Sequence, residues 1–141
     1  MHQGYSMHTR SDHSRLALAQ RKFDPLAHVL DRLSREIEKE YGRSAALKPR
    51  GSMQQTAGNV YEVQYALREP QGANLSLTFM VVGDDADLLL LEQQEQSRPD
   101  DNRADPGQVD QRVYRLGEVE TIKTAVKEKI INHLRARGVL H

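Results

Sequence analysis

Two segments of the chain carry apolar side chains spaced like one face of a helix. The first runs from residue 25 to residue 41, where apolar residues recur every three or four positions and charged residues fill most of the remaining positions. A repeat of about 3.6 residues places such side chains on one side of a helix. Asp24 suits an N-cap, Pro25 suits the first helical position, and Gly42 suits the end of a helix. The pattern therefore predicts an amphipathic helix over 25–41.

The second helical pattern follows Gly117, near the end of the sequence. Its apolar positions are Val119, Ile122, Ala125, Val126, Ile130 and Leu134. Glu118 and Glu120 lie at the start of this segment and Arg135 lies near its end, a distribution that complements the helix dipole. We expect a helix that ends before Gly138.

Between these segments, apolar and polar residues alternate. The alternation runs through residues 61–68 and resumes in residues 74–82. A period of two is typical of strands that bury one face. The intervening segment 69–73 contains proline and glycine, which favour a turn. The two segments therefore predict an antiparallel hairpin.

Two further strands are expected after the hairpin. Residues 88–91 are all leucine, and so short an apolar run fits a strand or a helix by pattern alone. Its position directly after the turn at 83–87 favours a strand. Residues 109–116 predict a weaker fourth strand, with Tyr114 and Leu116 on one face.

The order α-β-β-β-β-α predicts a two-layer α+β fold, in which both helices pack on an antiparallel meander sheet of three to four strands. We expect a single domain over residues 23–140. Residues 1–22 show no periodicity and predict a disordered N-terminal arm, and residues 43–58 predict a long loop. Residues 95–108 have almost nothing to bury and predict a flexible loop.

The composition narrows the possible classes of function. The chain has 141 residues, with 20 basic and 20 acidic side chains, so no strong overall attraction to nucleic acid or anionic lipid is expected. It has no cysteine, which excludes disulfides, thiolate catalysis and cysteine-based metal sites. No apolar run matches a membrane span, and the N-terminus lacks the apolar region of a secretory signal. We expect a cytoplasmic protein without a membrane partner.

Sequence signatures of enzymes are missing. The chain contains no GxSxG, HExxH, GxxxxGK[ST] or GxGxxG motif, and His28 and His133 are expected on helix surfaces. The acidic turn 84–87 could offer oxygen ligands to Ca²⁺ or Mg²⁺, but ordinary turn chemistry also accounts for Asp84, Asp85 and Asp87. We expect no catalytic residues, no cofactor and no metal site. A small metal-dependent enzyme that uses this turn is the second alternative.

An apolar sheet face gives the favoured hypothesis for function. If both helices cover one face, the other face exposes Met80 and Val82 from one strand and Leu89 and Leu91 from the next. A contiguous exposed apolar patch usually marks a protein contact, unless the chain's own loops or N-terminal arm cover it. The hypothesis is a non-enzymatic protein-interaction module, such as a small adaptor, chaperone or regulatory subunit. Its partner is another protein or a second copy, which would make a homodimer.

Basic residues supply the first alternative. They lie in the loop 43–50 and the C-terminal helix, and are Arg43, Lys48, Arg50, Lys123, Lys127 and Arg135. On one surface, they could bind the phosphates of a nucleic acid or another anionic ligand. Tyr61 and Tyr65 are expected in the core, however, which leaves no exposed aromatic side chain on the sheet for bases to stack on. Nucleic acid is therefore the less favoured partner.

Overall fold

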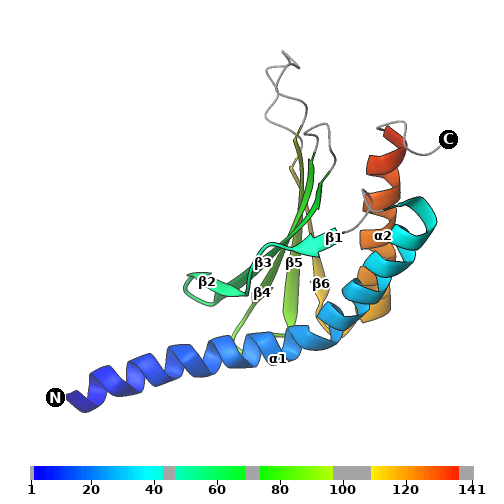
Figure 1. The fold of residues 1–141 in the computed structure, drawn as a ribbon. Helices are drawn as coiled ribbons and strands as arrows, with labels where there is room; N and C mark the ends of the chain where they lie inside the picture. The colour runs from blue at the N-terminus through cyan, green and yellow to red at the C-terminus, as the bar shows by residue number, and fades with distance from the viewer. Residues whose placement is uncertain (1, 43–46, 69–73, 97–108, 137–141) are drawn as a thin grey trace.

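The computed structural model describes residues 2–42, 47–68, 74–96 and 109–136. In these ranges, helix α1 (His2–Tyr41) comes first and helix α2 (Val119–Ala136) comes last, with six strands between them. The strands are β1 (Leu47–Pro49), β2 (Gln54–Ala57), β3 (Val60–Arg68), β4 (Asn74–Val82), β5 (Leu88–Gln96) and β6 (Val109–Arg115). The predicted class, an α+β fold with an antiparallel sheet between two helices, is confirmed (Figure 1).

All strands pair antiparallel, in the order β1-β3-β4-β5-β6, and β2 also pairs with β3. The leucine run 88–91 opens strand β5, as its position after a tight turn indicated. Residues 43–58, predicted as a loop, instead contain β1 and β2, which pair with successive parts of the β3 edge. These strands have only three and four residues, too few to show an alternating pattern, and pairing with β3 accounts for them. The segments 43–46 and 97–108 lie outside the described residues.

Helix α1 is much longer than the sequence predicted. It begins at His2 and not near Asp24, so residues 2–22, expected to be a disordered arm, are helical. Three apolar residues ahead of Asp24 continue the stripe at the same spacing, namely Leu16, Ala19 and Phe23. Because these residues pack on the core, the apolar face extends upstream of the expected start.

Pro25 lies inside α1 and not at its beginning. A proline in a helix interior cannot donate to the carbonyl four residues earlier, and its ring crowds that carbonyl, so helices bend there. Figure 1 shows α1 turning between its blue and cyan halves. The blue half also contacts the residues directly before β3 and β5. Arg15 Nη1 donates to Asn59 Oδ1 at 3.1 Å, and Lys22 Nζ pairs with Asp87 Oδ1 at 2.8 Å.

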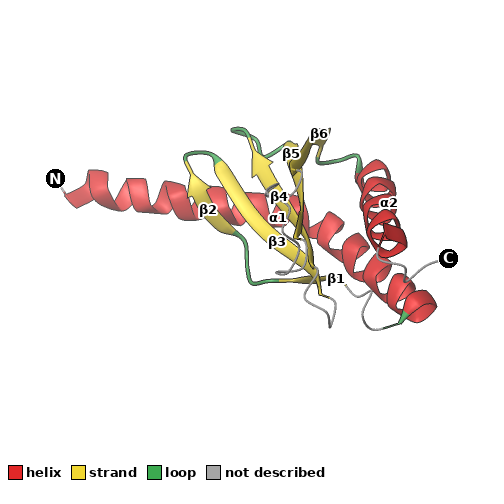
Figure 2. Cartoon of the chain, turned by 90° about the horizontal axis from the view of Figure 1, so that it is seen from above, coloured by secondary structure: helices red, strands yellow, loops and turns green. Residues whose placement is uncertain are grey.

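The core lies between one face of the sheet and both helices. Phe79 of β4 is fully buried at its centre, with ring centroids 5.8 Å from Phe23 of α1 and 5.2 Å from Tyr65 of β3. Helix α1 crosses the strands, and α2 lies beside its later part (Figures 1 and 2). Alternate residues of each central strand therefore face the helices, and the residues between them face away.

Candidate functional site

The sheet has an open face, formed by the residues of β3 to β6 that alternate with the core residues. Both helices contact the opposite face: Phe23 of α1 meets Phe79, and Lys129 of α2 meets Gln93 and Asp110. The open face is therefore covered by neither helix. Its cross-strand rows follow from the strand register and are Glu62–Met80–Leu90–Val113, Val82–Leu88–Arg115 and Gln64–Thr78–Glu92–Gln111.

The structure corrects which leucines belong to this face. Leu89 and Leu91 were expected there with Met80 and Val82, but both are completely buried. They pair with Val81 and Phe79, whose side chains point to the core. All four residues of the run 88–91 are leucine, so the sequence does not show which of them face the core and which face away from it. Leu88 and Leu90 occupy the places assigned to Leu89 and Leu91.

Six apolar side chains form a contiguous group on the open face, which we call the open-face patch. Its members are Val60, Met80, Val82, Leu88, Leu90 and Val113. Val113 is 66% exposed and Leu88 is 42% exposed, and the other four are partly exposed. These two are the large apolar residues left exposed among the described residues. Polar residues border the patch, which is the arrangement of a protein contact surface.

Opposite charges lie on two sides of the open-face patch. Glu62 on β3 neighbours Met80, whereas Arg115 on the edge strand β6 neighbours Leu88. The two therefore lie on different strands with β4 and β5 between them. Neither charge forms an ion pair within the described residues, although Glu62 Oε1 accepts a hydrogen bond from Gln64 Nε2 at 3.3 Å.

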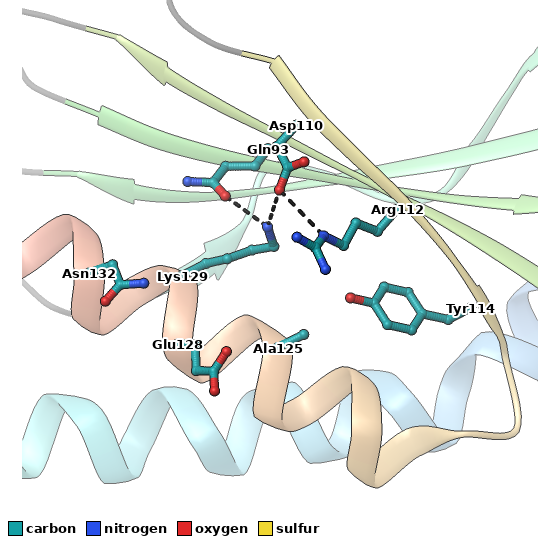
Figure 3. A pocket seen from close by; sticks show the side chains of 8 residues that line it. All are labelled: Gln93, Asp110, Arg112, Tyr114, Ala125, Glu128, Lys129 and Asn132. Carbon is teal, nitrogen blue, oxygen red and sulfur yellow. Dashed lines mark hydrogen bonds and ion pairs between the residues drawn. The ribbon is translucent and has the colours of Figure 1, made fainter.

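A second feature is a polar pocket of about 240 Å³ between β6 and α2 (Figure 3). Lys129 Nζ donates to Gln93 Oε1 at 2.8 Å and to Asp110 Oδ2 at 3.0 Å. The Lys129 side chain is only 12% exposed, so this ammonium joins α2 to β5 and β6 from a largely buried position. Its hydrogen bond and its charge hold the pKa of the Asp110 carboxyl below the usual value, and Arg112 adds to the effect.

The pocket also contains further charged groups, one of which pairs with the same carboxylate. Arg112 Nε lies 3.7 Å from Asp110 Oδ2, beyond hydrogen-bonding distance, and its guanidinium points into the pocket (Figure 3). Tyr114 from β6 and Glu128 and Asn132 from α2 complete the polar lining, with Ala125 between them. The sequence predicted no functional role for any of these residues. The only sequence feature that pointed to this pocket was the pair of charged residues at alternate positions of β6, Asp110 and Arg112.

The structure does not gather the basic residues of the nucleic-acid alternative onto one surface. Lys48 pairs with Ala66 of β3 and therefore shares the open face, whereas Lys123, Lys127 and Arg135 lie on α2, across the sheet. Arg50 follows β1, where its amide donates to Gln64 O at 2.7 Å, and Arg43 lies outside the described residues. A single phosphate-binding surface made of all six is therefore unsupported.

The acidic turn uses its carboxylates within the fold. Asp84 Oδ1 accepts from Asn59 Nδ2 at 3.0 Å, and Asp87 pairs with Lys22. Within the described ranges, no group of three or more acidic or histidine residues is placed to hold a metal ion. Of the two helix histidines expected at the surface, His28 is exposed, but His133 is buried at 2% because it faces the core side of α2.

Neither α1 nor α2, as far as the chain is described, is long and apolar enough to cross a membrane. Comparison with protein-family models, with curated proteins and with solved structures gives no match. The fold and the site thus define only a class: an α+β domain with one sheet face beneath two helices and the other face uncovered by them.

Proposed function

We propose that this protein is a non-enzymatic interaction module that binds a protein partner through the open-face patch, and that a second copy of the chain is one such partner. The observation that carries the proposal is the contiguous apolar group on a sheet face that neither helix covers. Burying apolar surface against a partner is favourable by about 25 cal/mol per Å². The adaptable Met80 suits a contact surface.

The size of the open face supports this proposal. Strands lie about 4.8 Å apart and rise about 3.3 Å per residue, so a face of four strands and nine residues measures roughly 20 by 30 Å in projection. Specific protein interfaces bury about 800 Å² of accessible surface on each partner. Because accessible area exceeds projected area, the open face is large enough for an interface of ordinary size.

The distribution of charge supports a second copy as the partner. In the proposed dimer, the open faces of two copies stack on each other. The two-fold axis runs parallel to the strands and passes between β4 and β5. Strand β3 of one copy then overlies β6 of the other, which places Glu62 over Val113 of the second copy and one cross-strand row from its Arg115. The same operation places Met80 on Leu90 and Val82 on Leu88. An isologous contact of this kind pairs apolar with apolar side chains and brings opposite charges diagonally next to each other. The zero net charge of the chain adds no overall repulsion.

Self-association is tested by measuring mass across a concentration series, by light scattering and sedimentation. The wild-type chain is expected to approach twice its mass of 16.0 kDa as concentration rises. Met80→Glu and Leu90→Glu are expected to keep it monomeric, because each places a charge in the apolar contact. Gln94→Glu, exposed on the same face but farther from the patch, is the matched control and is expected to dimerise. A wild-type chain that stays monomeric at every concentration contradicts self-association.

A charge exchange tests the geometry of the proposed dimer. Glu62→Arg or Arg115→Glu alone is expected to weaken association, because each places like charges together. The double variant is expected to recover much of the loss, since the pair is restored with its signs reversed. Additive losses in the double variant would rule out the pairing of these two residues, although not the apolar contact itself.

A further inference from the structure

Strand β6 places two of its three charged side chains on the helix side of the sheet and Val113 on the open face. Asp110, Arg112 and Tyr114 lie opposite Gln93, Leu91 and Leu89, and so they face α2. Val113, on the other side, is 66% exposed. A strand packed beneath a helix normally turns its apolar side inward. Such a local conflict with the folding pattern is expected where residues serve a function other than packing.

Lys129 organises one side of the resulting pocket. Its ammonium has three N–H donors, of which two go to Gln93 Oε1 and Asp110 Oδ2. The opposite charges of Lys129 and Asp110 offset each other, and the pair links α2 to the sheet on this side of the pocket. The pair does not by itself call for a charged ligand.

Arg112 and Glu128 are two further charges in the pocket, beside the Lys129–Asp110 pair. They stand on different walls, Arg112 on β6 and Glu128 on α2 (Figure 3). Arg112 pairs with Asp110 through Nε at 3.7 Å, and its side chain is 66% exposed, whereas Glu128 makes neither a hydrogen bond nor an ion pair within the described residues. Tyr114 adds a hydroxyl on the side of Arg112. The site therefore offers a cation with a planar set of donors and, across the pocket, an anion that only accepts.

We propose that this pocket binds a small zwitterion of the α-amino acid type. Its carboxylate would lie on the Arg112 guanidinium, which matches carboxylate geometry with paired N–H donors, and would accept from the Tyr114 hydroxyl. Its ammonium would pair with Glu128. A cavity of about 240 Å³ is smaller than those that hold drug-sized molecules, which limits the ligand to a few heavy atoms beyond its two charged groups.

The experiment is an NMR titration of the ¹⁵N-labelled full chain with glycine, alanine and glutamate. Acetate and methylammonium serve as half-ligands, and inorganic phosphate tests for a general anion site. Saturable shifts confined to β6 and α2 are expected for at least one amino acid. Each half-ligand is expected to bind at least about tenfold more weakly, because it leaves Arg112 or Glu128 unpaired.

Variants separate specific binding from loss of structure. Arg112→Gln and Glu128→Gln are each expected to weaken binding at least about tenfold, and Arg112→Lys also weakens it, because the paired donors are lost while the charge remains. The matched controls are Arg115→Gln, on the same strand but the open face, and Glu120→Gln, at the exposed start of α2. Both are expected to leave affinity unchanged. Thermal unfolding of each variant checks that it is folded.

Three results would overturn the proposal: no saturable shift with any of the amino acids, equal binding of acetate or phosphate, or equal losses in the Arg112 and Arg115 variants. The outcome is independent of the proposed dimer, because the pocket and the open-face patch lie on opposite faces of the sheet. A monomeric Leu90→Glu variant is therefore expected to keep its affinity for the zwitterion.

Discussion

Ser34 joins the first helix to the edge of the sheet through one hydroxyl group. Its Oγ donates to the carbonyl oxygen of Leu47 at 2.8 Å and accepts from the amide of Leu47 at 2.9 Å. Ser34 is 2% exposed and Leu47 is 2% exposed, so these groups are shielded from water. One side chain thus satisfies both backbone groups of the first residue of β1.

Removing this hydroxyl group is expected to destabilise the fold. Ser34→Ala leaves the N–H and C=O of Leu47 buried without these partners, and each such loss costs about 1–3 kcal/mol. Urea denaturation is expected to show a lower midpoint with a similar slope. Ser52→Ala, at an exposed position, is the control. A change in unfolding free energy below about 0.5 kcal/mol, the usual size for a surface substitution, would contradict this role.

Tyr61 presents the opposite case. It is 3% exposed, and its hydroxyl finds no hydrogen-bond partner among the described residues. An unsatisfied buried hydroxyl is unfavourable, so Tyr61→Phe is expected to keep or raise the free energy of unfolding, by up to about 1 kcal/mol. Tyr65→Phe gives a comparison at a neighbouring core position. A clear loss of stability in Tyr61→Phe would mean that the hydroxyl is satisfied in solution.

Helix α1 shows why its element boundary could not be read from local signals. Asp24 and Pro25 resemble a helix start, and Gly42 marks the observed end, where its amide donates to Glu38 O at 2.8 Å and its φ is 98°. The end was predictable because glycine readily adopts positive φ. The start was not, because packing of Leu16, Ala19 and Phe23 on the core outweighs the local preference.

The contact between β6 and α2 is expected to depend on pH through Asp110. Lys129 lowers the pKa of this carboxyl, first by its hydrogen bond and then by its charge. A carboxyl with a lowered folded-state pKa stabilises the fold above its unfolded pKa, and this contribution disappears as pH falls through the folded value. The contact is therefore complete at neutral pH and is lost progressively below about pH 4.

Carboxyl NMR titration checks this prediction. Asp110 is expected to titrate below the ordinary aspartate range in the wild-type chain and to return towards it in Lys129→Met. Lys123→Met, elsewhere on α2, is expected to leave the Asp110 titration in place. An unshifted Asp110 in the wild-type chain would mean that the bond to Lys129 does not persist in solution.

At the scale of the whole molecule, the class of fold was predictable and the functional surface only in part. Alternation in residues 61–68 and 74–82 identified the central hairpin, and Met80 and Val82 were correctly expected on the open face. Leu89 and Leu91 were assigned to the wrong face of the sheet, because a run of four identical residues shows no alternation. The pocket was missed because Asp110 and Lys129 are distant in sequence, and only the fold of α2 onto the sheet joins them.

The first half of β6 places Asp110 and Arg112 on the helix side and Val113 on the open face, so apolar packing alone does not fix the register of this strand. Sliding the strand by one residue would turn Val113 towards α2 and move Asp110 away from Lys129. Two anchors oppose that slide: the Lys129–Asp110 bond near one end, and the amide of Leu116 on Asp87 O at 2.8 Å near the other. Acid weakens the first anchor and leaves the second intact. Local unfolding of β6 in acid is therefore expected to begin at Val109, while the bond of Leu116 is kept.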